Sequence, residues 1–148
     1  MKIAVGADHR GFAQKQFVQQ AISNVAWIDV GACDEVRSDY PLFAHAVCSL
    51  IQAGSAEKGL LLCATGVGMA VAANRFAGIY AAVAHTAELA RLSVEHDNIN
   101  VLVIPSDYIS CDELIAIVTA WNSAQFLGGR YQERIALIDA LGGVMDRR

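Results

Sequence analysis

The sequence has 148 residues, of which 55% are hydrophobic, and it carries a net charge of −4. This acidic balance, without a basic stripe, argues against nucleic-acid binding, and no apolar stretch is long enough to cross a bilayer. The N-terminus has no signal-peptide pattern and the four cysteines have no metal-ligand spacing. We therefore expect one cytoplasmic domain over residues 1–148, with reduced thiols and no metal.

In the first half of the chain, short apolar strands alternate with amphipathic helices. We expect strands at 2–5 and 26–30, each followed by a glycine, with a helix at 12–22 between them. A polar loop at 32–39 leads to the next helix. That helix begins near Pro41, because proline lacks the N–H that a first helical turn leaves unpaired.

The chemical centre of the sequence is an apolar run at 59–63 that enters a turn of small residues and then a helix ending at Asn74. Such a run is typical of a buried parallel strand in a βα unit. The turn sets the thiol of Cys63 and the hydroxyl of Thr65 beside the N–H groups of a helix N-terminus. This setting favours developing negative charge, and we expect it to lower the pKa of the thiol.

The second half repeats the alternation, with strands at 78–84 and 100–104 around a helix at 86–95. A capping box at 110–113 opens another helix, and a last helix follows at about 131–141. Five apolar strands alternating with helices predict an α/β fold, namely a single-domain, doubly wound, Rossmann-like parallel sheet of five strands with helices on both faces. Ligands bind such sheets at the carboxyl ends of the strands.

Several side chains capable of chemistry follow these strands, but each alone has an ordinary structural interpretation. A cysteine such as Cys63 at a strand end is more often a small core residue, and a lone histidine such as His85 is more often solvated. Arg130 and Arg134 lie one helical turn apart and can face one anion, or simply face solvent. The glycines at 66–71 do not complete a dinucleotide fingerprint.

Six short motifs taken together are more specific. They are Gly6-Ala7-Asp8-His9-x-Gly11-Phe12, Asp39-Tyr40-Pro41, Cys63-x-Thr65-Gly66-x-Gly68-Met69, Ala72-Ala73-Asn74-Arg75, Glu95-His96 and Gly129-Arg130-x-x-x-Arg134. In order and spacing they resemble the type B ribose-5-phosphate isomerases and the related galactose-6-phosphate and allose-6-phosphate isomerases. The resemblance covers nearly the whole chain.

The resemblance implies a cofactor-free aldose–ketose isomerase that forms a homodimer or a dimer of dimers. Its active site would lie between protomers, with the C-terminal helix contributing to dimer and site. The implied roles are proton transfer between C1 and C2 by Cys63, proton movement between oxygens assisted by Thr65, enediolate binding by amides near Gly66 and Gly68, ring opening by His96 with Asp8, phosphate binding by His9, Arg130 and Arg134, and a substrate contact by Tyr40.

Four positions depart from the family pattern, and they gather around substrate recognition. Ala64 replaces a glycine, Tyr131 a histidine and Asp107 an arginine of the phosphate site. Asp97 replaces an asparagine, exchanging an amide that can donate a hydrogen bond for a carboxylate that cannot. We therefore predict the reaction type but not the sugar.

The most unusual of these replacements is Asp107. A carboxylate about 6 Å from a phosphate is disfavoured by roughly 3 kcal/mol per phosphate charge at an effective dielectric of about 20. We expect that Asp107 faces solvent, that it pairs with Arg130 or Arg134, or that the phosphate lies elsewhere because the sugar differs in length. We favour the last, with Asp97 and Asp107 contacting sugar hydroxyls.

Two alternatives remain within the same fold: a non-catalytic sugar-phosphate-binding protein, and one subunit of a hetero-oligomeric isomerase. The intact Cys63, Thr65 and His96 argue against both, because a sensor needs no base. A flavodoxin-like nucleotide module fits less well, since Asp8 would repel a phosphate after the first strand.

Overall fold

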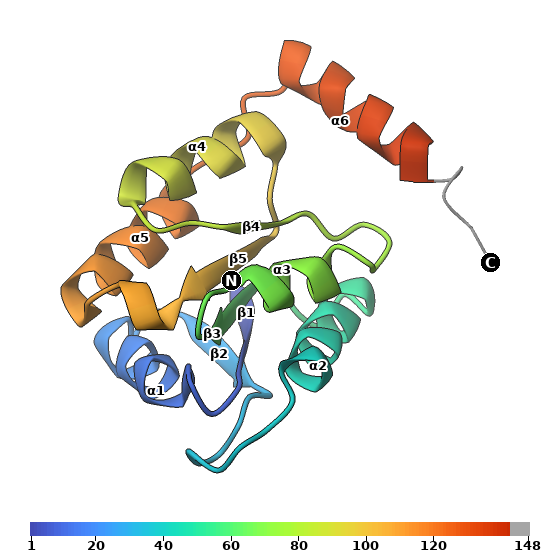
Figure 1. Cartoon of the computed structure of the whole chain (residues 1–148). Coiled ribbons are helices and arrows are strands. Elements are labelled where there is room, and N and C mark those ends of the chain that lie inside the picture. The colour runs from blue at the N-terminus through green and yellow to red at the C-terminus, as the bar shows by residue number, and fades with distance from the viewer. Residues whose placement is uncertain (143–148) are drawn as a thin grey trace.

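The structure, a computed structural model that describes residues 1–142, is built on a sheet of five parallel strands (Figure 1). The strands are β1 (Lys2–Ala7), β2 (Ala26–Asp29), β3 (Lys58–Cys63), β4 (Ala81–Val83) and β5 (Val101–Pro105). Their order is β2-β1-β3-β5-β4, so β3 lies in the centre. The predicted fold class and all five strands are confirmed.

Strand β4 is shorter than the predicted 78–84, because a side chain takes over part of the pairing. The Asn100 side chain accepts a hydrogen bond from the Tyr80 main-chain N–H (2.9 Å) and donates one to the Gly78 carbonyl (2.8 Å). These bonds hold the segment beside β5 without strand geometry.

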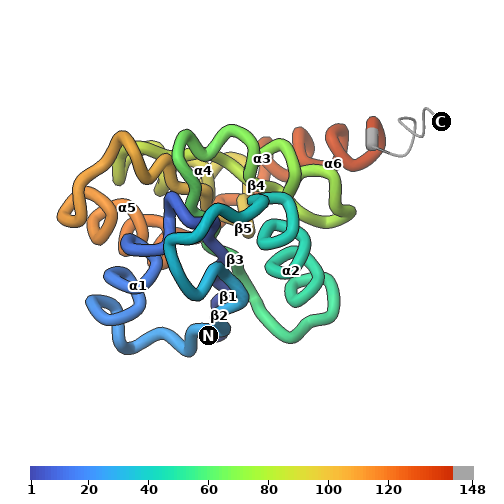
Figure 2. Tube along the Cα trace, turned by 60° about the horizontal axis from the view of Figure 1, so that its bottom comes forward, coloured from blue at the N-terminus to red at the C-terminus, as the bar shows by residue number. Residues whose placement is uncertain are grey.

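The helices cover both faces of the sheet. They are α1 (Phe12–Ala21), α2 (Tyr40–Gln52), α3 (Val67–Ala73), α4 (Ala87–Asp97), α5 (Cys111–Ser123) and α6 (Arg130–Gly142), with a short 3₁₀ turn, η1 (Ser106–Tyr108). Helices α1, α4 and α5 pack on one face, and α2 and α3 on the other. Figure 2 shows α1 and α5 on one side of the strands and α2 on the other. The capping box at Ser110 and Glu113 is confirmed.

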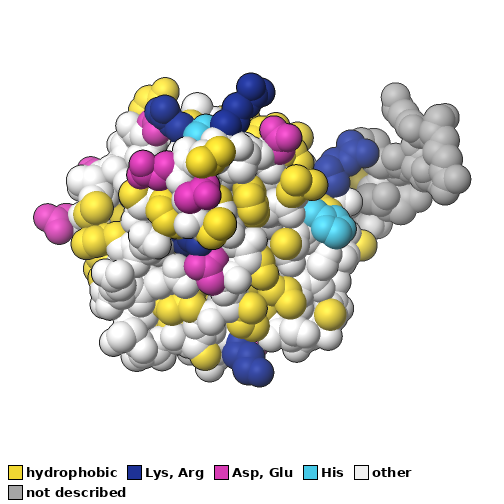
Figure 3. All heavy atoms as spheres, turned by 90° about the horizontal axis from the view of Figure 1, so that it is seen from below, with side chains coloured by type: hydrophobic (Ala, Val, Ile, Leu, Met, Phe, Trp, Pro, Cys, Tyr) yellow, Lys and Arg dark blue, Asp and Glu magenta, His cyan; other side chains and the backbone are white. Residues whose placement is uncertain are grey.

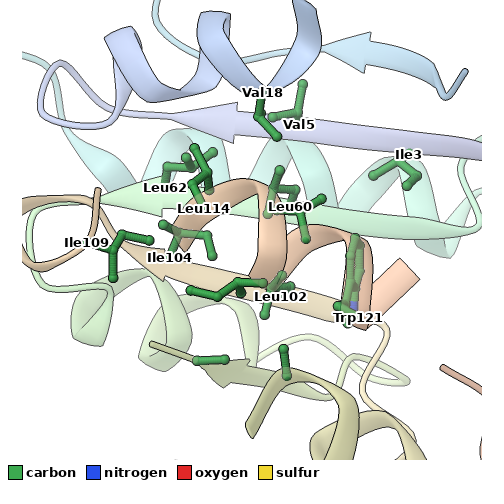
Figure 4. Packing of buried hydrophobic residues seen from close by; sticks show 14 of the residues in the cluster. Ile3, Val5, Val18, Leu60, Leu62, Leu102, Ile104, Ile109, Leu114 and Trp121 are labelled. Carbon is green, nitrogen blue, oxygen red and sulfur yellow. The ribbon is translucent and has the colours of Figure 1, made fainter. Parts of the chain in front are cut away.

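Successive side chains of each central strand enter opposite cores, as the pleat of a strand requires. Leu60 and Leu62 pack toward α1 and α5, whereas Leu61 and Cys63 pack toward α2 and α3. Figure 4 shows the first of these cores, where Trp121 of α5 lies beside the strand side chains. Because both faces of β3 are buried, its sequence is a continuous apolar run rather than an alternating one.

Helix α6 lies apart from the layered body and projects from it beside α4 (Figure 1). Ile135 is buried and the Tyr80 hydroxyl donates a hydrogen bond to Asp139, whereas Leu137 and Ile138 are exposed. On the face seen in Figure 3, apolar side chains reach the surface in small groups among charges of both signs. Within residues 1–142, no helix has the length and apolar character of a membrane span.

Candidate active site

The turn between β3 and α3 places the thiol of Cys63 at the carboxyl end of the central strand. Cys63 is the last residue of β3 and is 5% exposed. Gly66 turns the chain into α3 with φ of +75°, and a Cβ there would lie 3.2 Å from Val83. Only glycine adopts this backbone conformation without strain and fits this space. The exposed Thr65 accepts a hydrogen bond from the Val67 main-chain N–H through its hydroxyl (3.3 Å).

The environment of the Cys63 thiol acts on its pKa in two directions. Burial raises the pKa above its ordinary value, while hydrogen bonds from the main chain of Gly66, Met69 and Thr65 lower it and the charge of Asp8 raises it. The net direction is upward, so the predicted lowering of this pKa is wrong. The reason is that loss of hydration penalises the thiolate more than the amides stabilise it.

Asp8 lies beside Cys63 because the loop after β1 approaches β3 closely. A Cβ at Gly11 would stand 2.5 Å from the carbonyl oxygen of Leu62, so this approach requires glycine. Asp8 is 6% exposed, and its Oδ1 accepts hydrogen bonds from the main-chain N–H groups of Arg10 (2.9 Å) and Gly11 (3.2 Å). These bonds satisfy one carboxylate oxygen and fix the side chain.

His9 is held by a reciprocal pair of hydrogen bonds with Ser38. The His9 main-chain N–H donates to Ser38 Oγ (3.1 Å), and the Ser38 main-chain N–H donates to His9 Nδ1 (3.2 Å). Because Nδ1 is the acceptor, a neutral His9 ring carries its hydrogen on Nε2. This leaves Nε2 as a donor at the carboxyl end of β1.

Tyr40 opens α2 and lies over the start of α3. A Cβ at Gly68 would stand 2.5 Å from the Tyr40 ring, so the glycine lets the ring lie against the backbone of this turn. An open hollow of about 460 Å³ lies at the carboxyl ends of β3, β4 and β5. It is lined by Thr65, Val83, His85, Pro105, Tyr108 and Glu113.

Asp107 forms an ion pair that the sequence analysis did not consider. Its Oδ2 lies 2.5 Å from Nη2 of Arg10, which follows His9 in the loop after β1. Within one chain, the described part of the structure pairs Asp107 with Arg10 and not with Arg130 or Arg134. The pairing compensates the carboxylate that made Asp107 costly near a phosphate, and it raises the pKa of Arg10, chiefly through the hydrogen bond.

The remaining predicted residues gather around the end of α4. The His96 and Tyr131 rings stack, with centroids 4.3 Å apart and planes 7° from parallel. The guanidinium carbons of Arg130 and Arg134 lie 5.0 and 5.9 Å from the Tyr131 ring centroid, and Arg130 donates a hydrogen bond to its hydroxyl (3.0 Å). Asp97 is exposed as the last residue of α4.

These two sets of residues occupy opposite ends of the sheet. Cys63 pairs in register with Pro105 at the end of β5, whereas α4 ends only four residues before β5 begins at Val101. The start and end of β5 are about 13 Å apart, at roughly 3.3 Å per residue. We call the two sets the carboxyl-end group (Asp8, His9, Arg10, Tyr40, Cys63, Thr65, Asp107) and the amino-end group (His96, Asp97, Arg130, Tyr131, Arg134).

Two contributors, Arg10 and Ser38, were missed from the sequence because they carry no motif of their own. Tyr131 was named as a departure from the family pattern, but its contact with His96 was not predicted, because it joins residues far apart in the chain. The only available signal was the opposite charge of Arg10 and Asp107, which follow the two strands on either side of β3. All four cysteines have free thiols, and within residues 1–142 no cluster of three or more acidic, histidine or cysteine side chains could hold a metal.

Comparison with known proteins adds to this geometry. Residues 3–138 match the model of a family described as Ribose/Galactose Isomerase. The chain is 41% identical to ribose-5-phosphate isomerase B of Escherichia coli over 95% of each chain. It is 32% identical to D-erythrulose-4-phosphate isomerase 2 of Mycolicibacterium smegmatis, over 85% of this chain and 86% of that protein.

A solved structure shares the whole architecture. Ribose-5-phosphate isomerase B from Mycoplasma genitalium, crystallised with bound ribulose-5-phosphate, superposes with a TM-score of 0.91 over 96% of each chain. The sequence identity to this protein is 34%.

Proposed function

The chain belongs to the ribose/galactose isomerase family, and on this premise we propose that it interconverts an aldose phosphate and a ketose phosphate of four to six carbons through an enediolate. The observation that carries the proposal is the buried Cys63 thiol, with main-chain amides directed at it, on the same turn as Thr65, which lines a hollow large enough for a small sugar. Relatives with five-carbon and four-carbon substrates in their names support this size range.

In the proposed reaction, the Cys63 thiolate takes the proton from C2 of the open-chain aldose and returns it to C1. Negative charge develops on the substrate oxygens, where the amides near Gly66 and Gly68 can donate hydrogen bonds. The Thr65 hydroxyl, exposed at this turn, moves a proton between the two oxygens. A raised thiol pKa makes the thiolate a stronger base, and burial keeps water away from the enediolate.

We further propose that a second copy of the chain completes the site. In one chain the amino-end group is too far from Cys63, so its members would act from the partner. His96 would open the sugar ring with Asp8, Arg130 and Arg134 would bind the phosphate with His9, and Tyr40 and Asp97 would contact the sugar. The exposed positive charges of Arg130 and Arg134 suit phosphate binding, and the exposed carboxylate of Asp97 suits a contact with sugar hydroxyls.

Exposed apolar side chains support this association. Val67 and Val71 are exposed on α3, next to Cys63, and Leu137, Ile138 and Leu141 are exposed on α6, next to Arg134. Burying the α6 set against the α3 set would bring the arginines to the thiol. A symmetric homodimer, alone or within a dimer of dimers, makes this contact twice.

The reaction requires neither metal nor redox cofactor, because one proton moves between adjacent carbons and no electrons leave the substrate. A panel of four- to six-carbon aldose and ketose phosphates, followed by proton NMR in deuterated water, tests the proposal. We expect interconversion of at least one pair, with deuterium entering the product at the carbon that receives the proton. Binding without turnover of any sugar would contradict it, and the inactive Cys63→Ala variant controls for a contaminating isomerase.

A further inference from the structure

Both partners of the ion pair between Arg10 and Asp107 are hydrogen-bonded to other parts of the carboxyl-end group. The Asp107 main-chain N–H donates to the carbonyl of Ala64 (3.0 Å), the residue between Cys63 and Thr65. The Arg10 main-chain N–H donates to the Asp8 carboxylate. Each partner is therefore tied directly to the segment that holds a reacting side chain.

A second link fixes the distance between the two loops. The Gln14 side-chain amide donates to the carbonyls of Ser106 (3.2 Å) and Ile109 (2.9 Å), so α1 is fastened to the η1 turn on both sides of Asp107. Because these hydrogen bonds connect the two segments, the ion pair has a fixed position. It lies beside the hollow, which is lined by Pro105 at the end of β5 and by Tyr108 of η1.

The guanidinium of Arg10 retains capacity for a ligand. Its side chain is 54% exposed, and the bond to Asp107 uses one of its five N–H donors. No other acceptor lies within hydrogen-bond reach of this guanidinium among the described residues. An arginine held along one edge by a carboxylate can bind a phosphate along another edge.

Other cations at this end of the sheet are less suited to an anionic substrate. Lys15 is buried and its ammonium group is already bound by the Asp29 carboxylate (2.7 Å) and the Ala32 carbonyl (2.8 Å). Arg37 lies on the exposed loop before α2, and no described contact orients its side chain. Arg10 is the arginine that this end of the sheet holds in a fixed place.

We propose that Arg10 binds the phosphate of the substrate and that Asp107 is the positioning residue that orients the Arg10 guanidinium. This inference rests on the proposed function, because it assumes that a sugar phosphate binds beside Cys63. It assigns Asp107 to the support of a neighbouring cation instead of a direct contact with sugar hydroxyls. Arg10 then supplies the charge that the family pattern places at position 107.

Calorimetric titration with inorganic phosphate at constant ionic strength tests the proposal without turnover. Arg10→Gln should weaken phosphate binding at least about tenfold, which is 1.4 kcal/mol, and Arg10→Lys should weaken it less. Arg91→Gln is the matched control, because Arg91 forms an ion pair of the same 2.5 Å length with Glu95 on α4. It should bind phosphate like the wild type.

Protection of Cys63 from iodoacetamide, read by mass spectrometry, reports where the phosphate binds. Phosphate should slow alkylation of Cys63 in the wild type and in Arg91→Gln, but not in Arg10→Gln at the same concentration. Exposed Cys33 serves as the internal control and should react equally in all samples. Equal phosphate affinity of the wild type and Arg10→Gln, or binding that leaves Cys63 unprotected, would overturn the proposal.

The role of Asp107 has its own test, because Asp107→Asn should act differently in two backgrounds. With Arg10 present, the change removes both the support of the guanidinium and a repulsive charge, so phosphate affinity should not improve. In Arg10→Gln only the repulsion is removed, and affinity should improve at least about threefold. An equal improvement in both backgrounds would show that Asp107 acts independently of Arg10.

The two levels of proposal can fail separately. If no sugar phosphate is isomerised but phosphate binding depends on Arg10, the proposed function fails and the phosphate site stands. If sugar phosphates are isomerised and Arg10→Gln leaves KM unchanged, the isomerase stands and the role of Arg10 is refuted.

Discussion

At the carboxyl end of the sheet, Asp8 and Cys63 are almost entirely buried, whereas at the amino end Arg130 and Arg134 are exposed on a helix that projects from the body (Figure 1). The first pair is fixed by main-chain hydrogen bonds and by a turn that approaches β3 too closely for any side chain at Gly11. Among the contacts within residues 1–142, the second pair is held by side chains, with both guanidinium groups near the Tyr131 ring.

This difference matches the two kinds of chemical work in the reaction that we propose. Proton transfer at carbon requires a base shielded from water and fixed donors for the oxyanion, which a buried turn of the main chain supplies. Recognition of a phosphate by a second protomer requires exposed cations that can reach across an interface.

Loss of the proposed base should have the largest effect. Cys63→Ala should lower the isomerisation rate by about 10²-fold to 10⁴-fold or more, because it removes the thiol that we propose as the proton-transfer group. Binding of inorganic phosphate should be nearly unchanged, since no charge is lost. A variant that kept a tenth of the wild-type rate would show that another group is the base.

At the amino end, removing the Tyr131 ring should have a moderate effect. Tyr131→Ala should lower kcat/KM about tenfold, because His96 loses its stacking partner and Arg130 its hydrogen-bond acceptor, whereas Tyr131→Phe should cost only about threefold. Erythrose 4-phosphate, which has no hydroxyl free to form a ring, separates the two roles. With this substrate the effect of Tyr131→Ala should shrink to the part caused by the arginines. If Tyr131→Ala showed the wild-type rate with every substrate, a positioning role of Tyr131 would be excluded.

Neutralising the buried carboxylate should change the thiol itself. Burial is the main cause of the raised Cys63 pKa, and the charge of Asp8 adds to it. Asp8→Asn should therefore move the pH profile of Cys63 alkylation to lower pH, while the amide oxygen can still accept hydrogen bonds from Arg10 and Gly11. The profile of exposed Cys33 should not move, and a Cys63 profile that stayed in place would exclude electrostatic coupling between the two groups.

The smallest effect is expected where α6 is attached to the body. Tyr80→Phe removes the hydroxyl that bonds Asp139 and should cost about 0.5–1 kcal/mol of stability. That bond raises the pKa of Tyr80 to about 12. Because the folded pKa lies above the usual value of about 10, the contribution is present below pH 10 and is lost as the pH rises toward 12. Chemical unfolding of both proteins across this range would reveal the difference, which should vanish at the upper end.

Much of the carboxyl end was predictable from the sequence, because its geometry is local. The run before Cys63 had to be a buried strand, and Asp8 and His9 followed another strand, so the two sets had to share one end of a parallel sheet. The pKa direction of Cys63 was not predictable. It depends on how completely the surrounding helices cover the thiol, which no local pattern encodes.

The amino end shows a different limit. His96 lies near the end of a helix just before a strand, and this alone predicts that it is away from Cys63. Its contact with Tyr131, by contrast, depends on how α6 packs on α4. The pairing of Arg10 with Asp107 likewise joins residues 97 positions apart. Neither contact follows from periodicity or spacing, since both are side-chain contacts between segments brought together only by the complete fold.

The central claim is that the two ends of the sheet meet across an interface between two copies. It is tested by refolding a mixture of Cys63→Ala and Arg134→Ala chains, each inactive alone under the assay conditions. If the claim holds, a heterodimer contains one site with both native residues, and purified heterodimers should recover about half of the wild-type activity. Heterodimers of wild type with a chain carrying both substitutions serve as the control and should be inactive. Inactive single-substitution heterodimers, together with half-active control heterodimers, would contradict the claim by placing both residues in one chain's site.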